Sequence, residues 1–118
     1  MVENSLLEDL NLVEIVQEIV ECLAMGGVSL PPRYYLLVAF FHRRLKTASA
    51  EQIREAIKIG NWVQTGIDFW IVSDMYQRLI LVEEDRKENF SEFADFLRSG
   101  GPTWDYLAEY FDRVALRA

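Results

Sequence analysis

Apolar residues recur at three- and four-residue steps along most of this chain, which is the spacing of amphipathic helices. The first such segment covers residues 5–24. Two capping boxes are available in it, so either one long helix or a short helix with a break at Asn11 satisfies the pattern. The capping pairs are Ser5 with Glu8 and Asn11 with Glu14, and the apolar positions are Leu12, Ile15, Val16, Ile19, Val20 and Leu23.

Eight consecutive apolar or aromatic residues at 34–41 form the most hydrophobic stretch. A buried strand is an alternative, because short apolar runs do not distinguish the two structures. We favour a helix from about 32 to 46, since the pattern continues to Leu45 without a turn signal and Pro31-Pro32 suits a first turn. We expect this helix to lie centrally, with one face made by Tyr34, Leu37, Val38, Phe41 and Leu45 and a less apolar side by Tyr35, Ala39, His42 and Lys46.

Four further helices follow from the same spacing and from capping residues. We expect them to begin after Ser49, Thr65, Ser91 and Thr103, respectively. Ser49 pairs with Gln52 as a capping box, and a short strand at 79–82 is a lesser alternative within the helix that reaches residue 83. The predicted fold class is all-α: a compact single-domain bundle of about six helices over residues 1–118, with a central apolar helix near 32–46.

The composition leaves two interpretations of the surface open. Apolar residues make up 51% of the 118 positions and aromatic residues 13%, which is more than a small monomer readily hides. A dense core with ordinary exposed apolar atoms accounts for this excess. A surface for a partner or for self-association accounts for it equally well.

Charge and cysteine content indicate which partners and which cellular compartment fit the chain. The net charge of −7 argues against non-specific nucleic-acid binding, which needs a broad field of Lys and Arg. The single cysteine excludes an internal disulfide and fits a cytoplasmic protein. The acidic N-terminal stretch does not look like a targeting signal, and no apolar run approaches the ~18 residues of a membrane span.

No motif indicates catalysis, and we expect no enzyme, no cofactor and no metal site. One His and one Cys cannot assemble a zinc ligand set. Cys22 and His42 could pair as a dyad, but no third orienting group is indicated, and a structural thiol is favoured. The Gly pairs match neither the Walker loop nor the dinucleotide fingerprint.

A non-catalytic protein–protein interaction module fits these features best. It would act as an adaptor, inhibitor or accessory subunit, and a homodimer is one form that such a module can take. Trp62 falls in a predicted loop and is the first candidate for an exposed anchor, since Trp and Tyr dominate binding hot spots. A role in pinning that loop is an equal alternative. Tyr35 and His42 on one helical face come next, followed by the adjacent cations Arg43, Arg44 and Lys46.

A nucleic-acid-associated regulator is the alternative function. Helices at 49–59 and 65–83 around Gly60-Asn61 suggest a helix-turn-helix. The start of the second helix is apolar and acidic, unlike a recognition helix, so any contact would depend on a local basic cluster. That cluster comprises Arg33, Arg43, Arg44, Lys46, Arg54 and Lys58.

Overall fold

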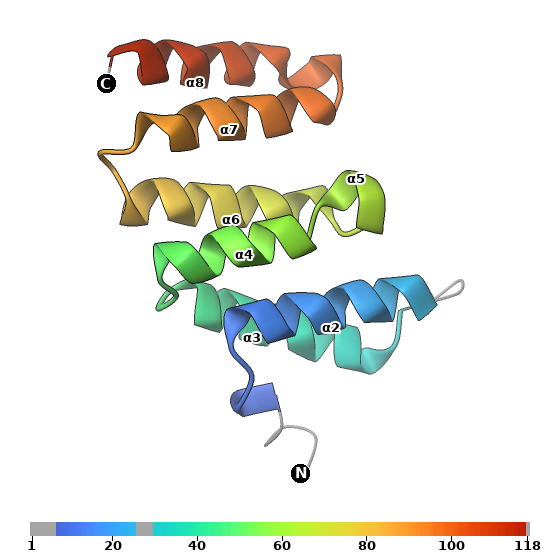
Figure 1. Ribbon diagram of the computed structural model, residues 1–118. Helices are drawn as coiled ribbons and strands as arrows, with labels where there is room; N and C mark the ends of the chain where they lie inside the picture. Colours follow the sequence, from blue (N-terminus) through green and yellow to red (C-terminus); the bar gives the residue numbers. More distant parts are fainter. Residues whose placement is uncertain (1–6, 26–29, 118) are drawn as a thin grey trace.

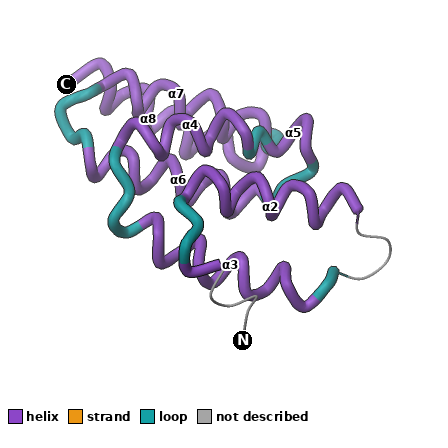
Figure 2. The backbone as a smooth tube through the Cα atoms, turned by 60° about the horizontal axis from the view of Figure 1, so that its bottom comes forward, coloured by secondary structure: helices purple, strands orange, loops and turns teal. Residues whose placement is uncertain are grey.

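The computed structural model describes residues 7–25 and 30–117 of the 118-residue chain. Helices and the turns between them account for these residues, and no strand occurs among them (Figure 2). The predicted all-α fold is therefore confirmed, and the strand alternatives at 34–41 and 79–82 are wrong. Ser5, half of the first predicted capping box, lies outside the described residues.

The helices stack in a row in which most neighbours in space are also neighbours in sequence (Figure 1). Each helix packs against the next in the series α3, α2, α4, α6, α7, α8. The molecule measures 49 × 30 × 17 Å along its principal axes. The elements are α2 (Leu12–Met25), α3 (Pro32–Leu45), α4 (Ala50–Ile59), the short α5 (Trp62–Thr65), α6 (Phe69–Val82), α7 (Lys87–Ser99), the 3-10 turn η1 (Pro102–Trp104) and α8 (Asp105–Arg117).

Side-chain caps fix the starts of α2 and α4 as the sequence predicts. The Asn11 side chain accepts a hydrogen bond from Glu14 N at 2.9 Å, and Asn11 N donates to Glu14 Oε1 at 3.0 Å. The chain therefore breaks at Asn11 instead of continuing one long helix. Ser49 and Gln52 form the second reciprocal box before α4.

Three predicted helix starts are wrong. Thr65 ends α5 instead of capping a helix; Gly66 follows in the left-handed region at φ 75°, and the Asp68 carboxylate caps α6 by accepting from Trp70 N at 2.7 Å. Ser91 lies within α7, which already begins at Lys87. Thr103 lies in η1, and α8 begins at Asp105.

The buried face of α3 is the predicted one, and it covers one side of the helix. Tyr34, Leu37, Phe41 and Leu45 are buried, whereas the side chains of Tyr35 and Leu36 are 65% and 40% exposed. The expectation that this run lies centrally is wrong: one face of α3 packs against α2 and contacts α6, while the opposite face is exposed, so the run is only half enclosed.

Helix α6 packs among several neighbours. The continuous core includes four side chains of α6 and one that lies just before it: Ile71, Val72, Met75 and Leu79, and Ile67. α4 and α7 flank it, and polar contacts connect it with α3: Asp74 lies 3.9 Å from His42 Nδ1, and Arg78 Nη2 donates to the Lys46 carbonyl at 2.6 Å. Because α4 and α7 flank α6, they leave a groove over it.

Candidate interaction groove

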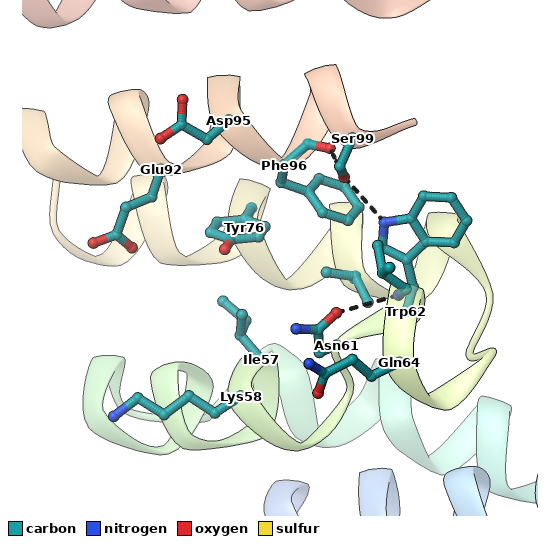
Figure 3. A pocket seen from close by; sticks show the side chains of 12 residues that line it. Ile57, Lys58, Asn61, Trp62, Gln64, Tyr76, Glu92, Asp95, Phe96 and Ser99 are labelled. Carbon is teal, nitrogen blue, oxygen red and sulfur yellow. Dashed lines mark hydrogen bonds between the residues drawn. The ribbon is translucent and has the colours of Figure 1, made fainter. Parts of the chain in front are cut away.

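An open groove lies between α4 and α7, with α6 as its floor (Figure 3). Its volume is about 600 Å³. Val72 and Tyr76 of α6 form the floor, and Trp62 of α5 stands at one end. Ile57 and Lys58 line the α4 side, and Glu92, Asp95, Phe96 and Ser99 line the α7 side. We call this feature the α6 groove.

Trp62 is the one predicted anchor that lines the α6 groove. It is the first residue of α5, whose start is capped by the Asn61 side chain, so the predicted loop is in fact a helical turn. Its indole Nε1 donates to Ser99 Oγ at 3.3 Å, and its ring meets Phe69 edge-on at a centroid distance of 5.6 Å. Trp62 is half-buried, so these contacts support the loop-pinning role while one side of the ring still lines the groove.

Tyr76 supplies an aromatic floor. Its ring stacks on Phe93 at 5.6 Å between centroids and tilts against Phe96 at 5.3 Å. Burial raises the pKa of the Tyr76 hydroxyl, and the nearby carboxylates of Glu92 and Asp95 raise it further. The hydroxyl, which is protonated at neutral pH in any case, remains so to higher pH and can both donate and accept a hydrogen bond within the groove.

The two rims of the α6 groove carry opposite charges. Lys58 on α4 and Glu92 on α7 are exposed, and neither forms an ion pair or side-chain hydrogen bond with any residue that the structure describes. Asp95 lies 3.4 Å from Arg98 of its own helix, and its side chain is 81% exposed. The rims thus leave charged groups available to an occupant.

The candidates on α3 lie away from the α6 groove. Tyr35 is exposed and meets the ring of Tyr34 edge-on at 5.5 Å. His42 is exposed and faces Asp74, whose pKa is raised by burial, lowered by His42 and raised by Asp68. The guanidinium of Arg43 lies 5.0 Å from the ring centroid of Phe40. Together these side chains form a separate polar and aromatic surface of α3.

The Arg44 side chain and the Lys46 backbone make contacts that hold the fold together. Arg44 Nε donates to the Leu10 carbonyl at 2.9 Å, and its Nη2 donates to the carbonyl of Glu8. Lys46 caps the end of α3 and uses its carbonyl to accept from Arg78. The Arg44 side chain is therefore committed to joining α3 with the segment before α2.

The six basic residues of the alternative function do not form a compact cluster of free cations. Arg33 pairs with Glu18 and Arg54 with Glu83, while Arg44 binds backbone carbonyls. Arg33 and Arg43 are ten residues apart in α3, or about 15 Å along the axis. The interposed α5 also replaces the short turn of the predicted helix-turn-helix, so α4 and α6 are joined by residues 60–68.

Sequence reasoning missed most of the α6 groove. Val72 and Tyr76 fall within the helix that the sequence predicts up to residue 83, and nothing in their spacing shows that a groove opens over them between α4 and α7. Phe96 lies in the helix predicted near Ser91, and it is buried. Glu92 and Ser99 carry no motif, and their part in the site depends wholly on the packing of α7 against α6.

The described residues offer little for metal or thiol chemistry. Among them, no group of three or more His, Cys, Asp or Glu side chains is placed to hold a metal ion. Cys22 is half-buried, and burial raises the pKa of its thiol, which disfavours the nucleophilic thiolate. Within the described residues, no helix is both long enough and apolar enough to cross a membrane.

Comparison of the chain with protein-family models, with curated proteins and with solved structures finds no match.

Proposed function

We propose that this protein is a non-catalytic interaction module that binds a segment of another protein in the α6 groove. The observation that carries the proposal is an open groove of about 600 Å³ with Tyr76 in its floor and Trp62 at its end. This volume lies within the range of ligand-binding pockets, roughly 300–1,000 Å³. It accommodates an apolar or aromatic side chain of a partner together with its flanking backbone.

The physical basis is the division between floor and rims. Burying an apolar side chain against Val72, Tyr76 and Phe96 supplies most of the binding free energy, because well-packed aromatic pockets are where hot spots occur. Lys58 and Glu92 on opposite rims select the orientation and charge pattern of the segment more than they add affinity. Adaptor, inhibitor and accessory subunit are all consistent with such a site.

The proposal also covers the cellular compartment and the domain organisation of the protein. We assign the module to the cytoplasm, since its one cysteine is half-buried and the sequence provides no disulfide framework. We also treat residues 1–118 as one domain, because a single continuous core extends from Leu7 to Ala108. Neither assignment affects how the groove works.

Selection of binders from a random peptide display library tests the proposal directly. We expect the selected peptides to share an apolar or aromatic anchor residue, and to lose at least tenfold in affinity with the Lys58→Glu, Glu92→Lys double variant. The double variant Lys46→Glu, Glu55→Lys makes the same changes outside the groove and should leave affinity unchanged. Binders that are insensitive to the groove variant, or a library that yields none, would refute the groove as a docking site.

A further inference from the structure

Helix α8 forms the end of the row, and its outer stripe is unusually aromatic for such a position. Tyr106, Tyr110, Arg113 and Arg117 recur at steps of four, three and four residues, which places them on one line along the helix. All four are exposed, and the two tyrosines are 67% and 54% exposed. The helices that end a stacked array are normally polar on the outside.

Charge is segregated along the same helix. Asp105 and Glu109 lie in the half that holds the tyrosines, and Arg113 and Arg117 lie in the other half. None of these four charged side chains forms an ion pair with any other described residue, whereas Asp112, on another side of α8, pairs with Arg98. The helix dipole favours this order of charges, but it does not account for two exposed tyrosines on the same stripe.

This pattern is self-complementary when one copy is reversed. We propose that α8 is a homodimer interface in which the α8 helices of two copies pack antiparallel about a two-fold axis between Tyr110 and Arg113. Tyr110 then faces Arg113 of the partner subunit, and Tyr106 faces Arg117 of the partner subunit. The tyrosine faces receive guanidinium groups as cation–π pairs, and the carboxylates of the same half add opposite charge.

A second copy explains the stripe better than an unrelated protein does. A two-fold axis makes every contact occur twice, so one helix has to supply both halves of each pair, as α8 does. Thirteen residues give a helix about 20 Å long, so the interface belongs to the small class that buries less than roughly 1,200 Å² in total. The dimer should therefore be reversible and sensitive to salt.

Sedimentation equilibrium across a series from about 10 to about 500 μM protein, at low and high salt, tests the proposal. We expect the mass of the natural chain to rise toward twice the monomer value at low salt and to fall back at high salt. With Arg113→Glu and Arg117→Glu, only acidic charges remain on the stripe and at the neighbouring positions 105 and 109; with Asp105→Lys and Glu109→Lys, only basic charges remain there. Each variant should stay monomeric alone because like charges then face each other.

The decisive arm is an equimolar mixture of the two reversed variants. Because an acidic stripe faces a basic one, the mixture should form a heterodimer, which a variant with merely damaged packing would not do. Helical circular dichroism confirms that each variant is folded, and Arg43→Glu, Lys46→Glu on α3 serves as the matched control that still dimerises. A monomeric natural chain at the highest concentration, unchanged dimerisation of the reversed variants, or a mixture that stays monomeric would overturn the proposal.

Discussion

The indole Nε1 of Trp62 donates a hydrogen bond to Ser99 Oγ at 3.3 Å and so joins α5 to the last residue of α7. The two residues are 37 positions apart in the chain. Ser99 Oγ in turn donates to the Phe96 carbonyl, which directs the oxygen lone pairs toward the indole. This short relay holds the closed end of the α6 groove in place (Figure 3).

Replacing Ser99 with Ala should loosen that end of the groove. We expect a loss of about 0.5–1.5 kcal/mol in the free energy of unfolding, because the substitution removes the hydrogen bond from Trp62 together with the bond to the Phe96 carbonyl, and Ser99 is exposed. The measurement is urea unfolding followed by tryptophan fluorescence. Ser91→Ala, an exposed serine of the same helix, is the control and should be neutral. Equal effects of the two substitutions would mean that the Trp62 contact contributes nothing.

Substitution of the two adjacent arginines at the end of α3 should cost different amounts of stability. Arg44→Gln removes the charged donor to the Leu10 and Glu8 carbonyls and should cost about 1–3 kcal/mol. Arg43→Gln removes an exposed cation over Phe40 and should cost about 0.5–1 kcal/mol or less. Chemical denaturation of both variants at the same ionic strength provides the comparison. An Arg43 variant that loses more stability than the Arg44 variant would contradict these contacts.

Gly100 should not accept a side chain without disturbing the aromatic packing after α7. A Cβ there would lie 2.7 Å from Phe69 Cε2 and 3.0 Å from Trp104 Cδ1, and these two rings stack at 5.3 Å. Gly100→Ala should therefore cost about 1–3 kcal/mol, as overpacked sites do. Thermal unfolding measures the loss.

A double-mutant cycle with Phe69→Leu identifies the cause of that loss. Because Leu leaves more room beside residue 100, Gly100→Ala should cost less in the Phe69→Leu background than in the natural chain. A cost that is the same in both backgrounds would show that the Phe69 ring is not the obstacle.

Asp74 should make the fold slightly less favourable at neutral than at acidic pH. Burial is the largest influence and raises the pKa of this carboxyl above its value in the unfolded chain, so the folded state holds the proton more readily. The group's contribution to stability is thus fully present below the unfolded pKa and is lost as the pH rises through the folded one.

The variant Asp74→Asn isolates this effect. It should gain stability relative to the natural chain as the pH is raised from about 3 to about 7, by less than about 1 kcal/mol because the side chain is more than one-third exposed. Glu55→Gln, at an exposed position of α4, is the control with no such trend. A difference that shrinks with rising pH would reverse the assigned direction.

The presence of each helix could be predicted from the sequence far better than the residue at which it begins. The apolar spacing of α2, α3 and α4 is regular, and the Asn11 and Ser49 caps have their reciprocal partners three residues on. Thr65, Ser91 and Thr103 failed as caps because a hydroxyl can equally well bond within a helix or turn, as Thr65 does by donating to the Asn61 carbonyl. Local sequence alone does not distinguish these cases.

The candidate site was less accessible to prediction, for a tertiary reason. Trp62 could be singled out as an unusual residue between helices, but its partner Ser99 is 37 positions away. From the sequence alone Arg44 is one of several cations at a helix end, because its acceptor, the Leu10 carbonyl, lies far away in the chain. Grooves and long-range hydrogen bonds depend on which helices become neighbours, and amphipathic spacing does not specify that.

The row-like order of the helices has a kinetic consequence. α4 packs on α6, α6 on α7 and α7 on α8, so most packing partners are consecutive or nearly consecutive in the chain. Folding then needs few closures of long loops, and rates in the microsecond-to-millisecond range of simple helical proteins are expected. Each pair of packed helices can also fold during synthesis on the ribosome, before the residues that follow it have been added.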